Sequence, residues 1–174
     1  MAIGENSPCF QFIHRTLGTG LVGVEIGIWD GGNAEAVLNY IYPDHYYMVD
    51  PYRVYPGSKT TIEEYERTFA EMSSKFSRYS SAIILRMTSE EASKTVENDL
   101  DFVYIDGAHD FENKILDLNL WYPKVRQGGV VCGDDLNIPS VREAVEKFTK
   151  ERNIEFQYSS NCDPHPPEFW FIKE

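Results

Sequence analysis

Leu21-Val22-Gly23-Val24-Glu25-Ile26-Gly27, residues 21–27, is a short hydrophobic run that meets a carboxylate and then turns at a glycine. Short apolar runs bounded by turn residues are typical of buried strands. Three later runs end in the same way, each followed by acids: 45–49 by Asp50, 100–105 by Asp106, and 129–133 by Asp134 and Asp135. In an open parallel sheet the carboxyl ends of the strands line one crevice where ligands bind. The pattern therefore predicts a row of acids along one edge of a sheet.

Segments with helical spacing alternate with these strands. Apolar residues recur at helical intervals in 31–42, 61–76, 89–97, 111–122 and 141–148. Thr61 and Glu64 form a capping-box pattern at the start of the second segment. In the fourth segment, the predicted apolar stripe is Phe111, Ile115, Leu118 and Tyr122. Alternation of strands and helices along a chain is typical of a parallel α/β sheet.

The last two strand-like runs, 154–158 and 169–172, are separated by a short loop. A loop of this length cannot hold a helical crossover, so we expect the last strand to be antiparallel. With a further strand at 81–85, the sequence predicts an α/β fold. It is a doubly wound, Rossmann-like sheet of about seven strands, with an antiparallel last strand and helices on both faces.

Composition narrows the classes of function. The 174 residues suit about one domain, and the three cysteines have no zinc or disulfide spacing. The N-terminus lacks the pattern of a signal peptide, and no apolar run is long enough for a membrane span, so we expect a cytoplasmic protein without a membrane partner. The formal net charge of −12 repels phosphate backbones, so a nucleic-acid partner is not expected. The sequence is also compatible with a homo-oligomer.

The turn after the first run does not suit a dinucleotide. Gly27 and Gly32 stand where the outer glycines of a G-x-G-x-x-G fingerprint belong, but Trp29 replaces the middle one. That glycine lets the backbone approach a pyrophosphate, so an indole there argues against this ligand. Asp50 follows the next strand, which is the usual place for an acid that binds a ribose diol. A ribose without a pyrophosphate indicates a nucleoside-type cofactor such as S-adenosylmethionine.

The ordered set of segments resembles class I S-adenosylmethionine-dependent methyltransferases. Residues 24–27 with 31–33 resemble their first motif, and 102–109 resemble their fourth strand. Residues 120–125 and 128–135 are similar to the following helix and fifth strand. The closest subgroup is the small O-methyltransferases, which include catechol and antibiotic-sugar enzymes. The resemblance covers about residues 20–172, so the chain is expected to be a single methyltransferase-like domain, 1–174, with a short N-terminal extension, 1–20, and a core, 21–174.

The resemblance assigns roles to the acids. It implies that the cofactor is bound by Glu25, Gly27, Asp50, Ser89 and Asp106. It implies that one Mg²⁺ is bound by Asp106, Asp134 and Asp135. His109 stands where catechol enzymes carry a lysine base, so it becomes the expected general base, one helical turn past Asp106. Asp134 and Asp135 could instead cap the helix that follows them.

The chemistry of methyl transfer favours such a set of residues. The acceptor hydroxyl must lose a proton, which a divalent cation and a histidine can promote together. We therefore expect metal-assisted O-methylation of a small hydroxylated molecule. Two alternatives stay open: a metal-independent N- or O-methyltransferase, and a nucleoside-cofactor-binding domain without catalysis.

Overall fold

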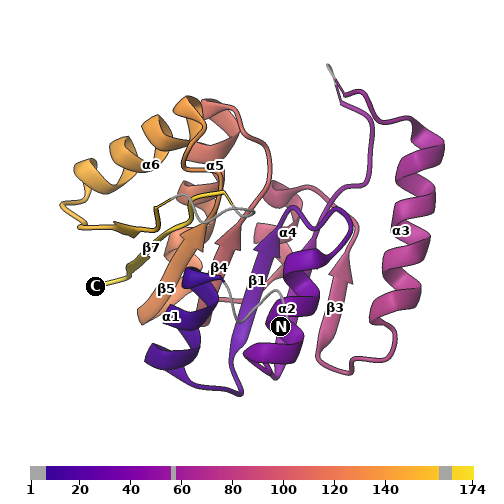
Figure 1. The fold of residues 1–174 in the computed structure, drawn as a ribbon, viewed down its shortest axis with the longest axis horizontal. Helices are drawn as coiled ribbons and strands as arrows, with labels where there is room; N and C mark the ends of the chain where they lie inside the picture. The colour runs from indigo at the N-terminus through magenta and orange to yellow at the C-terminus, as the bar shows by residue number, and fades with distance from the viewer. Residues whose placement is uncertain (1–6, 56–57, 161–165) are drawn as a thin grey trace.

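The computed structural model describes residues 7–55, 58–160 and 166–174. One sheet runs through it in the strand order β3-β2-β1-β4-β5-β7-β6 (Figure 1). Its strands are β1 (Val22–Ile26), β2 (His45–Val49), β3 (Ala82–Leu85), β4 (Leu100–Ile105), β5 (Val125–Gly133), β6 (Gln157–Tyr158) and β7 (Phe169–Ile172). The helices are α1 (Pro8–Leu17), α2 (Gly32–Tyr40), α3 (Ile62–Phe76), α4 (Ser89–Thr95), α5 (Phe111–Trp121) and α6 (Pro139–Glu151), with a 3₁₀ turn at Tyr122–Lys124.

The topology confirms the predicted fold class. Strands β1 to β5 run parallel to one another, whereas β7 is antiparallel to β5 and to β6. The chain order reverses between β1 and β4, because the strands on one side of that boundary precede those on the other. In an open α/β sheet such a reversal creates the crevice in which ligands bind.

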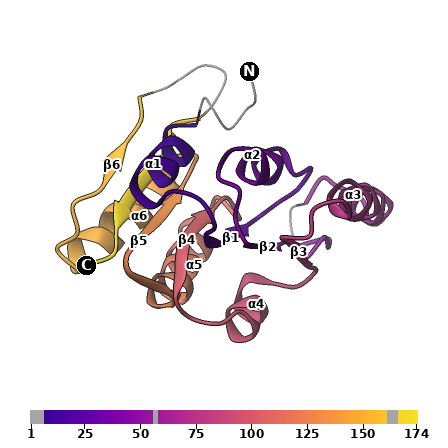
Figure 2. The same cartoon turned by 90° about the horizontal axis from the view of Figure 1, so that it is seen from below.

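Two hydrophobic layers enclose the sheet. Helices α1, α2 and α3 cover one face, and α4, α5 and α6 cover the other (Figure 2). The first layer includes Phe10, Val37 and Met72 beneath these helices. The second includes Ala92, Trp121 and Phe148. Burial of such side chains stabilises the fold by roughly 1.5–3 kcal/mol for each large apolar side chain.

Polar caps fix where several helices begin. The predicted capping box is present at α3, where Thr61 accepts from the backbone of Glu64 and the Glu64 carboxylate accepts from the backbone of Thr61. Thr88 and Glu91 form a second box at α4. Asp110 caps α5 by accepting from the backbone N–H of Asn113 at 2.9 Å. These bonds satisfy backbone donors that a helix start leaves without partners.

The structure differs from the sequence-based expectations in three places. Residues 8–17, expected in an extension outside the core, form α1, which buries Cys9, Phe10 and Ile13. The expected strand at 154–158 shortens to β6. Of the predicted apolar stripe of α5, Leu118 is buried and Ile115 and Tyr122 pack against the core, but the buried face also contains Lys114, Asp117 and Trp121. The two charged residues are buried in polar contacts, which hydrophobic spacing cannot reveal.

The described part of the chain contains no helix that is both long and apolar enough to cross a membrane.

The turn after β1 packs directly against the end of β4. Gly27 has a φ of +86°, and a Cβ atom there would lie 2.2 Å from the backbone oxygen of Asp106. The N–H of Gly27 donates to the oxygen of Val49 at 2.8 Å, and the N–H of Asp106 donates to the oxygen of Ile26 at 2.8 Å. Only glycine suits both the backbone angle and the close approach. This turn therefore joins the carboxyl ends of β1, β2 and β4.

We predict that Gly27→Ala lowers the free energy of unfolding by about 2–5 kcal/mol, because it adds a left-handed backbone cost to a clash with backbone. Gly18→Ala is the matched control. Gly18 has a φ of +87° but no atom within 4 Å of an added Cβ, so we expect a cost of only about 1–2 kcal/mol. Urea denaturation of both variants measures the difference, and equal losses would contradict the close approach at Gly27.

Candidate functional site

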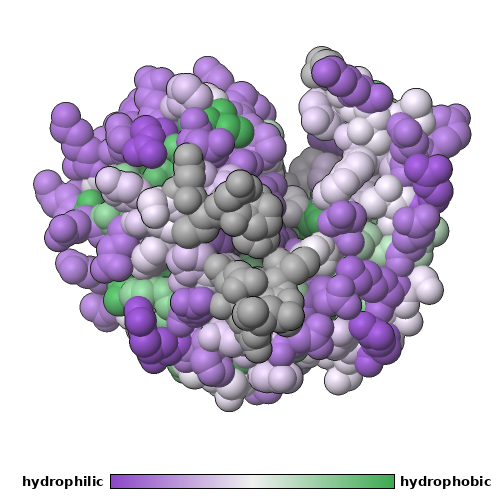
Figure 3. All heavy atoms as spheres, in the orientation of Figure 1, coloured by the Kyte–Doolittle hydropathy of each residue, from purple (hydrophilic) through white to green (hydrophobic). Residues whose placement is uncertain are grey.

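The predicted row of acids lies at the carboxyl edge of the parallel strands. Glu25 is in β1, and Asp50, Asp106 and Asp134 directly follow β2, β4 and β5. Figure 3 shows the surface hollowed above this edge, between α3 and the part of the molecule that carries α5 and α6. The side chains below therefore describe one site at the reversal of the strand order.

Glu25 is a buried acid held by a tyrosine. Its side chain is 1% exposed, and Oε2 accepts a hydrogen bond from the Tyr46 hydroxyl at 2.8 Å. Oε1 is buried and has no hydrogen-bond partner among the described residues. Burial raises the pKa of Glu25 to about 8, and the nearby carboxylates of Asp134, Asp50 and Asp30 act in the same direction. An orphaned carboxylate oxygen of this kind is a ready acceptor for a positively charged ligand group.

Asp50 holds the turn that follows β1. Its Oδ2 accepts from the backbone N–H groups of Ile28 and Trp29 at 3.1 and 3.2 Å, and its Oδ1 accepts from Tyr52 N at 2.8 Å. The Tyr52 hydroxyl donates to the oxygen of Trp29 at 2.9 Å, which holds Trp29 at a φ of +48°. A carboxylate has about four acceptor positions, so Asp50 keeps one for a ligand hydroxyl.

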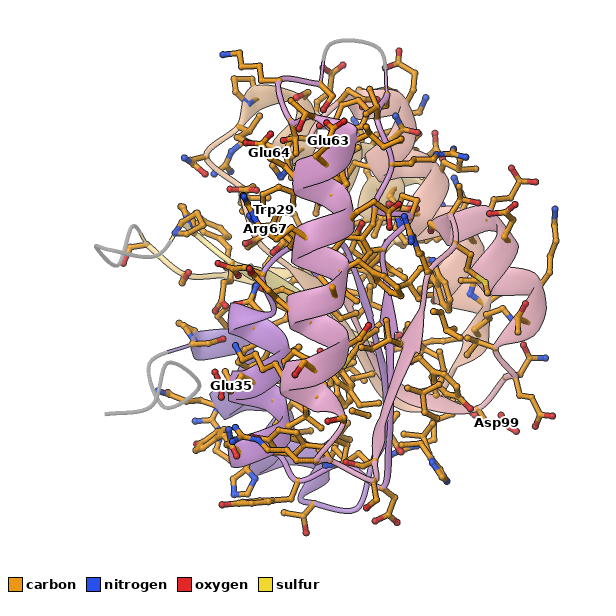
Figure 4. All side chains as sticks on the ribbon, turned by 90° about the vertical axis from the view of Figure 1, so that its right-hand side faces the viewer. Trp29, Glu35, Glu63, Glu64, Arg67 and Asp99 are labelled. Carbon is orange, nitrogen blue, oxygen red and sulfur yellow. The ribbon has the colours of Figure 1, made fainter. Side chains whose placement is uncertain are left out.

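Trp29 stands at the rim of this site. Its side chain is 46% exposed and makes an edge contact with the ring of Tyr65 in α3, with 5.8 Å between ring centroids. Figure 4 shows Trp29 on the side of the site that faces the N-terminal half of α3. The bulky indole where a dinucleotide fingerprint has glycine therefore lies against α3 at the rim of the site, with about half of its surface exposed.

Asp106 and Asp134 form a buried pair of acids whose pKa values are both raised. Burial, together with the Asp134 carboxylate, raises the pKa of Asp106, and burial, together with Asp135, raises the pKa of Asp134. A raised pKa favours the neutral form of an acid, which relieves the repulsion between two neighbouring carboxylates. Asn33 donates from Nδ2 to Asp106 Oδ2 at 3.0 Å. Asp134 Oδ1 has no partner among the described residues.

His109 and Asp135 form an ion pair at the mouth of the site. His109 Nε2 lies 2.8 Å from Asp135 Oδ2, and the His109 side chain is 50% exposed. The hydrogen bond with Asp135 raises the pKa of His109 and lowers that of Asp135. His109 precedes α5 instead of lying within a helix, because Asp110 takes the capping position. A loop, not one turn of helix, therefore brings the imidazole to the acids.

The group best placed for a metal ion differs from the predicted triad. Asp106, His109 and Asp135 offer ligand atoms that all lie within 4.8 Å of one another, whereas Asp134 does not join this group. Asp134 turns toward Asp106 instead. The alternative that Asp134 and Asp135 cap the next helix does not hold, because Ile138 occupies that position in α6 without a side-chain bond.

Ser89, one of the predicted cofactor-binding residues, is hydrogen-bonded to residues of α5. Its hydroxyl donates to Asp117 Oδ1 and accepts from Trp121 Nε1 at 2.8 Å. Burial raises the pKa of Asp117 to about 6. The Asp117 carboxylate in turn lies beside Gly107, where a Cβ atom would meet Oδ2 at 3.3 Å. The Ser89 hydroxyl has one acceptor position left, and its proton is already committed to Asp117.

Lys114 is a fully buried cation beneath the acids. It is 0% exposed, and Nζ donates to the oxygen of Ile105 at 3.1 Å. Its charge lowers the pKa values of Asp106, Asp134 and Asp135. A buried lysine is costly unless opposite charges surround it, so Lys114 and these acids stabilise one another.

Sequence reasoning therefore found the acids but missed the groups that hold them. Asn33, Tyr46, Lys114 and Asp117 each contact a predicted site residue or its backbone neighbour. The only available signal was in α5, where Lys114 and Asp117 are three residues apart and share a face with Trp121. No sequence pattern marks Asn33 and Tyr46 as site residues, because their contacts depend on the packing of neighbouring strands and turns.

A family model described as a methyltransferase domain matches residues 24–136, more than half of the chain and the whole segment from Glu25 to Asp135. Uncharacterized protein R132 of Acanthamoeba polyphaga mimivirus is 28% identical over 141 residues. That alignment covers 75% of this chain and 60% of the viral protein. The chain thus spans less than two thirds of the length of this relative.

Solved structures share the fold. The O-methyltransferase NovP has a TM-score of 0.68 and 19% identity, covering 94% of this chain and 76% of its own. Fibrillarin from Aeropyrum pernix, in complex with natively bound S-adenosyl-L-methionine, has a TM-score of 0.65 and 15% identity, covering 88% and 67%. An rRNA methylase from Streptococcus thermophilus has a TM-score of 0.64 and 12% identity, covering 94% and 92%. At these identities the likeness concerns the fold alone.

The raised pKa of Glu25 predicts how stability depends on pH. Folding moves this pKa from an ordinary 4.5 to about 8, so the folded state binds more protons between these values and loses stability as the pH rises. Glu25→Gln removes this loss. Relative to wild type, the variant should gain on the order of 2–4 kcal/mol in unfolding free energy between pH 5 and pH 8.5.

Urea denaturation at the two pH values measures this gain. Glu143→Gln is the control, because Glu143 is an exposed residue of α6 and is not among the groups that shift the pKa of Glu25. Its effect should be the same at both pH values. If the difference in unfolding free energy between Glu25→Gln and wild type is also the same at both pH values, Glu25 is ionised in the folded protein at neutral pH.

Proposed function

This chain belongs to the methyltransferase domain family, and we propose that it transfers a methyl group from S-adenosylmethionine to a hydroxyl group of a small molecule, assisted by a divalent cation. The observation that carries the proposal is the orphaned oxygen of Glu25 at the reversal of the strand order. Burial of an acid without a cationic partner is costly unless a ligand supplies one. The amino acid part of S-adenosylmethionine carries such a group.

The residues present fit this cofactor one by one. Glu25 Oε1 would accept from the ammonium group, and the turn at Gly27, which only glycine can form so close to Asp106, would border the amino acid part. Asp50 would use its remaining acceptor position for a ribose hydroxyl while its other positions hold the turn. Ser89 and Asp106 border the same edge. When bound, the cofactor supplies an activated methyl group on a sulfonium centre.

The residues around Asp106 would activate the hydroxyl group of the acceptor. The carboxylates of Asp106 and Asp135 would hold a divalent cation, which lowers the pKa of a bound hydroxyl group. Two carboxylates suit Mg²⁺ or Mn²⁺. Asp134 lies beside Asp106 and would support it. His109 is then left to accept the proton of the acceptor hydroxyl, because its half-exposed ring lies against Asp135 and faces solvent.

Net charge favours a small acceptor over a nucleic acid. The chain carries −12 formal charges, and the site itself is a cluster of carboxylates. A phosphate backbone would be repelled from such an edge. Trp29 and Tyr65 offer apolar contact at the rim, which suits a compact molecule with one reactive hydroxyl group.

One observation favours a second candidate, metal-free methyl transfer. The charge of the buried Lys114 already offsets part of the negative charge of Asp106 and Asp134. The His109–Asp135 pair offsets more of it. A site balanced in this way can use His109 as the base without a cation, and the effect of a chelator on turnover separates the two candidates.

We predict that S-adenosylhomocysteine raises the melting temperature of the wild-type protein, because a ligand at 100 times its Kd stabilises the folded state by about 2.7 kcal/mol. Asp50→Ala should weaken this binding roughly 10- to 100-fold, since it removes an acceptor for the ribose and releases the turn. Calorimetric titration measures both. Asp44→Ala is the control, because Asp44 precedes the opposite end of β2. Unchanged affinity in Asp50→Ala would reject the placement of the ribose.

His109→Ala should lower kcat by about 10²–10⁴ while leaving S-adenosylhomocysteine affinity within about twofold, because a positioned base acts only in the reaction. A screen of phenols, sugars and hydroxy acids first identifies an acceptor. Turnover is then measured with EDTA, with added Mg²⁺ and with added Mn²⁺. His45→Ala is the control, because His45 is exposed at the opposite end of β2.

The turnover measurements distinguish the metal-assisted candidate from the metal-free one. Turnover that requires Mg²⁺ or Mn²⁺ supports the cation, whereas full turnover in EDTA together with loss in His109→Ala supports the metal-free candidate. Full turnover of the His109→Ala variant would refute the role of His109 as base.

A further inference from the structure

Tyr46 is the side chain that sets the orientation of the Glu25 carboxylate. Both residues are buried, at 0% and 1% exposure, and they lie on neighbouring parallel strands. The Tyr46 hydroxyl donates to Glu25 Oε2 at 2.8 Å. The other oxygen, Oε1, is left without a partner in the described part of the chain. One oxygen is thus occupied by the protein and one is left for a ligand.

Packing leaves the Tyr46 ring little freedom. It stacks on Phe102 of β4 with 5.9 Å between ring centroids. Phe102 in turn lies over Gly23 of β1, where a Cβ atom would come within 2.2 Å of the phenylalanine ring. The absence of a side chain at Gly23 therefore admits Phe102, and Phe102 supports Tyr46. Because the hydroxyl is held through this stack, the hydrogen bond to Glu25 has a fixed direction.

We propose that Tyr46 is a positioning residue that presents Glu25 Oε1 to the ammonium group of the ligand, so that the site selects nucleosides carrying an amino acid group. This inference rests on the proposed function, because it refines which part of the cofactor the site recognises. Tyr46 would not touch the cofactor. It acts through Glu25 by occupying the oxygen that points away from the ligand.

The charges around Glu25 support recognition of a cation. The ionisable groups with the largest effect on its charge, apart from Tyr46, are carboxylates: Asp134, Asp50 and Asp30. Burial opposes ionisation of Glu25, whereas the hydrogen bond from Tyr46 favours it. Burial and the neighbouring acid raise the pKa of Tyr46 well above its ordinary value, so the hydroxyl keeps its proton and remains a donor. A neutral donor can orient the carboxylate without satisfying its charge, which is left for an ammonium group to neutralise.

The test compares two ligands that differ in the amino acid part. S-adenosylhomocysteine carries the ammonium and carboxylate groups, whereas 5′-methylthioadenosine retains only the nucleoside thioether. Calorimetric titration at pH 7.5 gives the Kd of both for wild type, Tyr46→Phe and Glu25→Gln. Tyr47→Phe is the matched control, because Tyr47 lies on the same strand and packs into the layer on the opposite face of the sheet.

Tyr46→Phe should weaken S-adenosylhomocysteine about tenfold, the change that corresponds to loss of a hydrogen bond to a charged group. It should leave 5′-methylthioadenosine within about twofold of wild type. Tyr47→Phe should leave both ligands unchanged. In the Glu25→Gln background, adding Tyr46→Phe should produce no further tenfold loss, because the two residues act as one unit.

Other outcomes overturn the inference in distinguishable ways. Equal weakening of both ligands in Tyr46→Phe would mean that Tyr46 only supports the fold, since a general loss of stability does not discriminate between them. Unchanged affinity for S-adenosylhomocysteine would also reject its role. Wild-type protein that binds neither ligand would reject the proposed function itself. Wild-type protein that binds both would leave that function standing, whatever Tyr46→Phe does.

Discussion

The close approach of the β1 turn to the end of β4 is the constraint on which the rest of the site depends. Gly27 admits the Asp106 backbone oxygen at a separation that no side chain would allow. Because β1 and β4 are parallel neighbours at the reversal of the strand order, this contact aligns the ends of β2, β1 and β4. The acids after these strands then converge on one edge. A shift of this turn would move Glu25, Asp50 and Asp106 relative to one another.

The site stores negative charge that the fold only partly offsets. Lys114 lies beneath the cluster, the pKa values of Asp106 and Asp134 are raised toward the neutral form, and His109 pairs with Asp135. Each of these effects lowers the cost of burying carboxylates. Two buried oxygens, Glu25 Oε1 and Asp134 Oδ1, are still without partners among the described residues. Such orphaned acceptors are rare in folded proteins, and their position at the crevice links the energetics of the fold to ligand binding.

The fold alone does not decide the acceptor. The similar structures include one named an O-methyltransferase and one named an rRNA methylase. Function is carried by the site that a fold supports. In this chain the distinguishing features are the Trp29 indole, the His109–Asp135 pair and the acidic surface. In the proposed function they lie on the acceptor side of the crevice, whereas Glu25, Gly27 and Asp50 lie on the cofactor side.

The sequence by itself determined the fold class, the order of its elements and the row of acids, because strand and helix periods and turn glycines are local properties of the chain. It also determined the antiparallel last strand, through the short loop before it. Only the tertiary structure decided that α1 belongs to the core and that Lys114 and Asp117 are buried. It alone decided that Asp106 groups with His109 and Asp135, and that Tyr46 holds Glu25. The contact of Tyr46 with Glu25 joins residues 21 positions apart, and the burial of Lys114 and Asp117 reverses the usual exposure of charged side chains. Such contacts arise from packing and mutual charge compensation that no local pattern encodes.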